Sequence, residues 1–350
     1  KKVLMAGCFA QRYGASLTEL MPELDGVFGN RSPSMAGEVV GRVMSGEKPV
    51  FLPEEQNQEI KRTDLLSLEG SAYVKLAEGC NNRCSFCAIP LIRGSLVSRN
   101  PQKIVDEVKD LLGRGIKEIN FVGQDLGAYG SDRSDGRITD LVLDVLKLKG
   151  DFWLRLLYIH PDHFPMDLPS ISSSDARLLP YYDIPFQHGS QKMLKKMGRK
   201  GSPHYYLQLI NKIRDAHPEA VIRSTFMTGF PGETAADFQD LKEFISAAEL
   251  DWTGFFTYSR EEGTAAYKMR GSLGHSLSKG RAKKYKSSLE SIQHQISCSR
   301  MKRYKGTTCT VLIEEAVQGE EDMYLGRTWF QAPEVDGLVV VHGSSLSPGQ

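Results

Sequence analysis

Three cysteines lie within one short segment, at Cys80, Cys84 and Cys87, with the spacing CxxxCxxC. Thiolates are ligands for soft metals, and three in so short a loop can bind three irons of a 4Fe-4S cluster and leave the fourth iron open. A zinc site is the alternative, but it needs a fourth ligand, and no further Cys or His lies nearby in the sequence. The spacing therefore favours an iron-sulfur cluster with one open coordination position.

The other three cysteines, Cys8, Cys298 and Cys309, stand alone along the chain. This uneven distribution favours metal binding by the clustered group over a disulfide framework. We interpret Cys298 and Cys309 as ordinary thiols.

Glycine-containing turns follow two predicted strands downstream of the cysteines. Gly123-Gln124-Asp125 follows one apolar run, and a Gly-rich segment at 223–233 ends another. A glycine lets the backbone approach a ligand closely. A glycine after a strand is, however, more often only a turn. Taken alone, these turns leave ligand binding and simple chain reversal both open.

An α/β fold must position these residues, because short apolar runs alternate with helical stretches from residue 71 to about 267. Asn100-Pro101 and Thr234 are helix-starting residues ahead of amphipathic stretches. Six parallel βα units predict an incomplete (β/α)6 barrel, with function at the carboxyl ends of its strands. The expected strands are residues 73–77, 118–122, 154–159, 181–185, 221–227 and 252–258.

Smaller units are expected on both sides of this barrel. Residues 1–45 have the pattern of the last part of an α/β domain, and 46–70 have the composition of a linker. Residues 268–300 predict a connecting helix with many basic residues and the single acid Glu290. Residues 301–350 are β-rich, with strands expected at 308–313, 324–330 and 335–341, and predict a small β-barrel. We expect the first and last units to be incomplete.

The composition is that of a globular protein. The 350 residues are 40% hydrophobic and 25% charged, with a formal net charge of +1. These values argue against a nucleic-acid coat, an acidic tail or disorder. No apolar run is long enough to span a bilayer, and no signal-peptide pattern is present. The sequence therefore predicts a cytoplasmic protein without a membrane partner.

The CxxxCxxC loop, placed just past the first barrel strand, resembles that of the radical S-adenosylmethionine (SAM) superfamily. The resemblance implies that the open iron binds the amino and carboxylate groups of SAM, and that an electron from the cluster cleaves it to a deoxyadenosyl radical. The protein then holds the cofactor and excludes solvent. The resemblance implies cofactor contacts at Phe86, Gly123, Gln124, Asp125, Arg223, Gly229 and Glu233.

Further segments, which with the cysteine loop cover nearly the whole chain, resemble the methylthiotransferase family. They are AGCFAQRYG (6–14), DIPFQHGS (183–190), MGR (197–199) and GFPGET (229–234). The family holds a second 4Fe-4S cluster on three cysteines of its amino-terminal domain, and this cluster donates the methylthio unit. Cys8 matches one ligand, and the other two would lie before Lys1, so this sequence alone should not assemble the second cluster. Gln187 and Arg199 match family positions around the cofactor.

Three more segments, 124–130, 158–164 and 332–337, resemble the family branch that modifies the β-carbon of an aspartate in the twelfth small-subunit ribosomal protein. A tRNA adenosine is the substrate of the other branch. Residues 301–350 resemble a TRAM domain and carry four basic and seven acidic residues. An acidic unit suits a basic ribosomal protein better than RNA, because RNA binding depends on phosphate neutralisation.

Several alternatives remain from the sequence. The basic stretch 268–300 could contact ribosomal RNA, although we favour a solvated face. His160 and His163 could act near the substrate, although a strand-end His is more often structural. A non-catalytic metal-binding adaptor that docks on the ribosome is the third functional hypothesis. The expected partners are the basic ribosomal protein, either free or on the assembled ribosome, and an electron donor such as a flavodoxin or ferredoxin.

Overall fold

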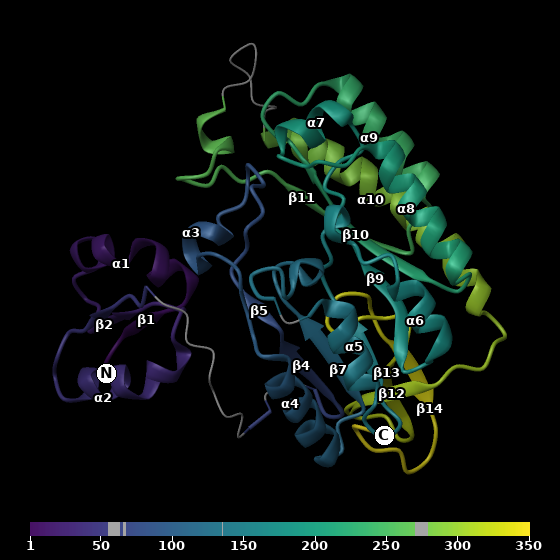
Figure 1. Cartoon of the computed structure of the whole chain (residues 1–350), viewed down its shortest axis with the longest axis horizontal. Coiled ribbons are helices and arrows are strands. Elements are labelled where there is room, and N and C mark those ends of the chain that lie inside the picture. The colour runs from purple at the N-terminus through teal and green to yellow at the C-terminus, as the bar shows by residue number, and fades with distance from the viewer. Residues whose placement is uncertain (55–63, 66–67, 135, 270–278) are drawn as a thin grey trace.

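A computed structural model of the chain describes residues 1–54, 64–65, 68–134, 136–269 and 279–350. Its amino-terminal unit stands beside the rest of the molecule (Figure 1). Here β1, β2 and β3 form a parallel sheet with α1 and α2 packed against it. The bounds are β1 Leu4–Ala6, α1 Cys8–Leu20, β2 Gly26–Phe28, η1 Pro33–Met35, α2 Ala36–Met44 and β3 Val50–Phe51.

The third strand corrects the predicted linker, which was expected to begin at residue 46. Val50–Phe51 pairs with β2, and the Phe51 ring stacks on Phe28 with the centroids 5.9 Å apart. A strand of two residues between prolines carries too little periodicity to be recognised from the sequence. Residues 55–63 and 66–67 of the predicted linker lie outside the described residues.

The central sheet has six strands in the order β11-β10-β9-β8-β7-β4, and all of its neighbouring pairs are parallel. All six predicted strands are confirmed. β4 and β11 are the two edges, so the barrel is incomplete as expected. The bounds are β4 Ser71–Lys75, β7 Glu118–Val122, β8 Trp153–Leu156, β9 Leu178–Asp183, β10 Val221–Thr228 and β11 Trp252–Thr257. The sequence did not indicate the short antiparallel pair β5 (Ala77–Glu78) and β6 (Val97–Ser98).

Helices cover the apolar face of this sheet (Figure 1). The predicted caps are confirmed, since the side chains of Asn100 and Thr234 accept hydrogen bonds from Lys103 N and Asp237 N. The helices are α3 Ile89–Arg93, α4 Pro101–Gly113, α5 Ile138–Leu146, α6 Leu168–Ser174, α7 Gln191–Lys196, α8 Pro203–Ala216 and α9 Ala235–Ala248. Single 3-10 turns are η2 Leu126–Ala128, η3 Pro161–His163, η4 Ala266–Lys268 and η5 Lys302–Tyr304.

The basic connecting helix, α10, runs over Lys279–Met301 rather than from residue 268. Lys268 ends η4 instead, and residues 270–278 lie outside the described residues. The helix packs against β11 and α9 and buries Leu289 in the main core. Most of its Lys and Arg side chains face solvent.

The carboxyl-terminal unit is an antiparallel sheet of β12 (Val311–Ala316), β13 (Met323–Thr328) and β14 (Val339–His342). It packs against the second face of the central sheet, where Leu179, Tyr181 and Val221 contact Phe330 and Ala332. These contacts lie toward the beginnings of the central strands. The carboxyl ends of the strands therefore stay clear of this unit.

Four buried charged residues join the two sheets, and we call them the interface charge cluster: Glu118, Arg155, Glu314 and Arg327. Glu118 lies 2.9 Å from Arg155 Nη2 and 2.6 Å from Arg327 Nη2, and Arg327 also pairs with Glu314. Burial alone would raise the pKa of Glu118, but the two guanidiniums outweigh burial and lower this pKa to about 2. The cluster is balanced, with two acids and two bases.

Candidate functional site

The cysteine loop lies beyond β5, at the carboxyl-terminal side of the central sheet. Gly79 begins it with φ +73, and a Cβ there would lie 2.0 Å from Ser95 O, so only glycine fits. All six cysteines are free, and burial raises the pKa of the Cys80, Cys84 and Cys87 thiols. Buried thiols with raised pKa values become good ligands once a cation offsets the cost of desolvating their thiolates.

Residues 196–199, which include the MGR segment, hold this loop in place. Ser85 N donates to Met197 O at 3.0 Å, and Ser85 Oγ donates to Lys196 O at 2.8 Å. A Cβ on Gly198, at φ +79, would lie 2.6 Å from Arg83 O. The glycine of this segment is therefore needed for its close approach to the cysteine loop.

Arg199 ends that segment as a buried charge. Only 6% of the residue is exposed, and within the described part of the chain its Nε and Nη1 have no hydrogen-bond partner. Its charge opposes the effect of burial on the pKa of Cys84 and of Cys87. An unpaired buried guanidinium is costly, so this geometry fits an anionic ligand beside the cysteines.

Asp125, in the Gly-Gln-Asp turn after β7, accepts four hydrogen bonds. Its Oδ1 accepts from the backbone N–H groups of Gly127 and His160, both at 3.1 Å. Its Oδ2 accepts from Asn82 Nδ2 at 2.8 Å and lies 2.7 Å from His163 Nδ1. The carboxylate therefore clamps the cysteine loop to the turn after β8, and its lone pairs are used.

This geometry gives Asp125 a positioning role, and its predicted contact with the cofactor stays a prediction. Burial raises its pKa, but the hydrogen bonds from His163 and Asn82 outweigh burial and lower it. The neighbouring Gln124 has a buried Oε1 with no partner among the described residues. Gln124 is thus the member of this turn with a free acceptor for a ligand.

His160 and His163 both lie at the site, with ring centroids 5.2 Å apart. His160 Nε2 is 4.0 Å from Cys84 Sγ. Burial and the charge of Arg199 lower the pKa of His160 to about 4, whereas the hydrogen bond to Asp125 raises the pKa of His163. The sequence offered no histidine close to the cysteines, and the fold supplies one from 76 residues away.

Phe86 and Gln187 lie at the same end of the sheet. Phe86 packs against an apolar cluster that contains Met193, Met197 and Phe230. Gln187 is buried, has φ +72 and bridges to Phe226 beside the end of β9. A non-glycine residue held in the left-handed region is a strained feature that is common at functional sites.

Three more of the predicted contacts, Arg223, Gly229 and Glu233, have local partners. Arg223 lies 3.2 Å from Asp183 and 3.4 Å from Asp336 of the carboxyl-terminal unit. Glu233 accepts from Gly229 N and lies 3.4 Å from His188 Nε2. The glycine at 229 is explained by α10, because a Cβ there would lie 2.7 Å from Ala282 Cβ. These contacts position the three residues, and their predicted contacts with the cofactor stay predictions.

Cys8 begins α1 and is exposed, on the side of its unit that faces α3. Its Sγ accepts from Asn30 Nδ2 at 2.9 Å and lies 3.6 Å from Arg93 Nη2. Arg31 of the same unit donates to Ile92 O at 2.9 Å, at the end of α3. Because α3 begins two residues after Cys87, one short helix connects the two cysteine-bearing segments.

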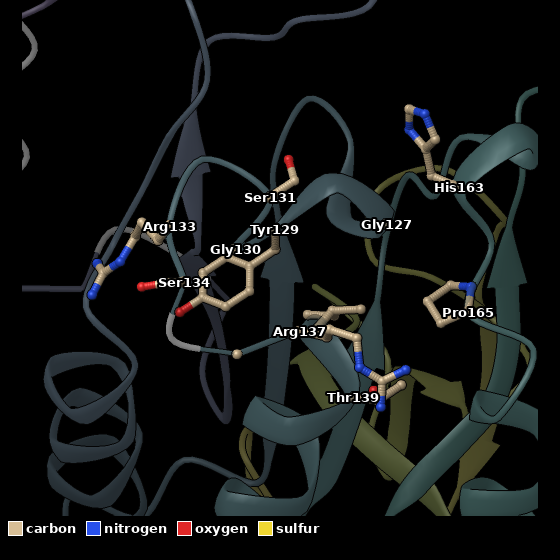
Figure 2. Close-up of a pocket in the computed structure, with 12 residues that line it drawn as sticks. Gly127, Tyr129, Gly130, Ser131, Arg133, Ser134, Arg137, Thr139, His163 and Pro165 are labelled. Atoms are coloured by element: carbon tan, nitrogen blue, oxygen red, sulfur yellow. The ribbon is translucent and has the colours of Figure 1, made fainter.

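A cavity of about 500 Å³ opens beside the site. Figure 2 shows His163 and Pro165 on one side of it and Arg133 and Ser134 on the other. His163 belongs both to this cavity and to the Asp125 clamp. The cavity therefore adjoins the cysteine site and offers polar and basic groups to a ligand.

Comparisons with known proteins agree with this geometry. A profile of the radical SAM superfamily matches residues 74–245, and a TRAM domain profile matches 306–350. The fold resembles the solved radical SAM methyltransferase TsrM from Kitasatospora setae with a TM-score of 0.55, at 15% identity over 73% of this chain and 55% of that one. The cobalamin-dependent radical SAM enzyme OxsB gives a TM-score of 0.52, at 12% identity over 75% of this chain and 41% of that one. The fold and the three-cysteine loop thus define a radical SAM protein.

Relatives over nearly the whole length narrow this class. The chain is 39% identical to the ribosomal protein uS12 methylthiotransferase RimO of Treponema denticola, over 99% of this chain and 82% of that protein. It is 40% identical to RimO of Syntrophomonas wolfei, over 97% and 76%, and 39% identical to RimO of Thermotoga maritima, over 98% and 77%. The chain belongs to the RimO family of methylthiotransferases. Among the helices that the structure describes, none could cross a membrane.

Proposed function

We propose that this chain attaches a methylthio group to the β-carbon of an aspartate in the ribosomal protein uS12, by radical SAM chemistry. The observation that best supports this proposal is the group of three thiols at the carboxyl ends of parallel strands. They lie beside Arg199, which is buried and has unpaired guanidinium nitrogens. The RimO relatives, at 36–40% identity over nearly the whole chain, support the substrate.

In this proposal Cys80, Cys84 and Cys87 bind a 4Fe-4S cluster whose open iron binds SAM. The donor set fits, since three free thiols leave one iron without a protein ligand. When bound, the cluster and SAM supply a deoxyadenosyl radical that removes hydrogen from the target carbon. The protein contributes binding, orientation and protection from solvent.

Arg199 and Gln124 have complementary tasks at the ligand. The unpaired guanidinium of Arg199 suits the SAM carboxylate, and the free Gln124 Oε1 suits the SAM ammonium group. Asp125 positions the cysteine loop through Asn82. The apolar cluster around Phe230, with Phe86 on its edge, keeps water away from one side of the site.

Replacing Arg199 by methionine is expected to weaken SAM binding by roughly 10- to 100-fold, since a charge-assisted hydrogen bond is lost. Equilibrium dialysis of labelled SAM against the iron-loaded protein measures this. Arg114→Met, at the exposed carboxyl end of α4 and away from the site, is the matched control. Equal SAM affinity in Arg199→Met and wild type would contradict the assignment.

Cys8 is proposed as one ligand of a second 4Fe-4S cluster that donates the sulfur, as the family resemblance implies. The contacts of its unit with α3 and with Glu261 would hold that cluster near the first. Arg12 pairs with Glu261 at 2.7 Å, and Arg31 bonds the last turn of α3.

The double variant Arg12→Ala and Arg31→Ala is expected to release this unit. Proteolysis at Arg93, the last residue of α3, should accelerate several-fold, since the released unit no longer packs against α3. Limited trypsin digestion followed by mass spectrometry measures the rate. Arg42→Ala, whose exposed pair with Glu47 stays within the unit, should leave the rate unchanged. An unchanged rate in the double variant would show that these contacts do not hold the unit.

The choice between protein and tRNA can be tested without the second cluster. Reconstituted protein is given SAM, a reductant and uS12 deuterated at aspartate β-carbons, either free or in small ribosomal subunits. Deuterium in the released 5′-deoxyadenosine supports the proposal. Deuterium that arrives only from labelled tRNA adenosine would contradict the protein substrate and indicate a tRNA methylthiotransferase. Absence of any SAM cleavage would favour the adaptor.

The charge of the carboxyl-terminal unit favours a basic protein over RNA as the substrate. Two of its seven acids, Glu314 and Asp336, are buried, as is one of its four bases, Arg327. The side chains left toward solvent are still more often acidic than basic. A flavodoxin or ferredoxin as electron donor remains part of the proposal, as does modification on the assembled ribosome.

A further inference from the structure

We propose that His160 donates a hydrogen bond from Nε2–H to Cys84 Sγ and thereby raises the reduction potential of the cluster bound there. This inference rests on the proposed function, because it assumes that Cys84 ligates an iron. The separation between His160 Nε2 and Cys84 Sγ is 4.0 Å. The effect would be on how easily the cluster accepts an electron.

The direction of the hydrogen bond follows from the tautomer of the ring. His160 Nδ1 accepts a hydrogen bond from the backbone N–H of Asp162 at 3.2 Å, so Nδ1 carries no proton. A neutral ring with an unprotonated Nδ1 must carry its proton on Nε2. The N–H group at Nε2 is therefore available to the sulfur.

The ring is also fixed in place. The backbone N–H of His160 is held by Asp125 Oδ1 at 3.1 Å. Asp162, whose N–H sets the tautomer, is itself held by the N–H groups of Lys200 and Gly201 at 2.9 and 3.0 Å. Only 7% of the His160 side chain is exposed. The imidazole has little freedom to turn Nε2 away from Cys84.

An N–H group aimed at a ligating sulfur stabilises the more negative, reduced cluster over the oxidised one. Hydrogen bonds to cluster sulfurs are among the features that set iron-sulfur potentials. Removing the donor should therefore make reduction harder while the three cysteine ligands remain. A purely structural role for His160 would change iron content or stability but not the potential of a fully loaded site.

The test compares wild type, His160→Phe, His160→Leu and His160→Gln after anaerobic reconstitution, with iron counting and an EPR-monitored redox titration. In the two variants without a donor, the equilibrium constant for one-electron reduction should fall several-fold, and a tenfold fall is a shift of 59 mV. His160→Gln keeps an amide N–H and should recover part of the shift. His204→Phe, on an exposed position of α8, is the control and should match wild type.

The outcomes separate the two proposals. A fully loaded His160→Phe or His160→Leu protein with the wild-type potential would overturn the role of His160 and leave the proposed function intact. Using two variants keeps the test decisive if one of them loads poorly. A wild-type protein that binds no four-iron cluster would overturn the proposed function itself.

Discussion

Replacing Cys80, Cys84 and Cys87 together by alanine is expected to abolish iron binding and SAM cleavage. The site has no other thiol among its described residues, so nothing could replace these ligands. Wild type should bind about four irons per cluster and give a reduced-cluster EPR signal, and the triple variant neither. Iron counting, EPR and release of 5′-deoxyadenosine are the measurements.

The cysteines far from this site provide the control. Cys298→Ala and Cys309→Ala should keep the iron, because these thiols lie on α10 and just ahead of β12. One tightly held zinc in the wild-type protein, in place of iron, would contradict the radical mechanism. That result would also make His160 a natural candidate for the fourth zinc ligand, because it lies beside Cys84.

Replacing Glu118 by glutamine is expected to destabilise the chain by about 3–5 kcal/mol, because Arg155 and Arg327 would keep buried charges with only Glu314 to balance them. The free energy of unfolding, measured by urea titration, should fall by this amount. Glu320→Gln, on an exposed turn, should change it little. A double variant, Glu118→Gln with Arg327→Met, should recover part of the loss. A single variant as stable as wild type would show that the cluster contributes nothing.

The same carboxylate predicts a pH dependence. The folded-state pKa of Glu118 is lowered from 4.5 to about 2, so its ionised form is favoured by folding. This contribution is fully present above pH 4.5 and is lost as the pH falls toward about 2. Wild type should therefore lose stability more steeply than Glu118→Gln across this window.

Much of the fold follows from local sequence patterns. The six strands of the sheet, the capped starts of α4 and α9 and the cysteine loop are encoded within short windows, by side-chain period, capping residues and ligand spacing. The relatives confirm the class that those patterns indicated. The predictions that failed concern the short strand β3 and the start of α10. A strand of two residues, such as β3, has no readable period.

The candidate site was predictable only in part. Local spacing indicated the cysteines, but the approach of His160 to Cys84 depends on the order of strands β8, β7 and β4 in the sheet. Asp125 was expected to bind the cofactor because its turn after the second strand resembles a superfamily motif. Its role as a clamp depends on Asn82 and His163, which the turn itself does not reveal. The local sequence indicates which residues lie near the site. Which of them already have all their hydrogen-bond partners can be known only from the folded structure.

The interface charge cluster also affects how the chain can fold during synthesis. Arg327 lies 209 residues after Glu118. It has therefore not yet been synthesised when the strands of the central sheet leave the ribosome. Until then Glu118 and Arg155 on the central strands lack Arg327 as a partner. Bringing residues so far apart in the sequence together is slow. The nascent central sheet should therefore stay open to chaperones and proteases until residues 301–350 emerge.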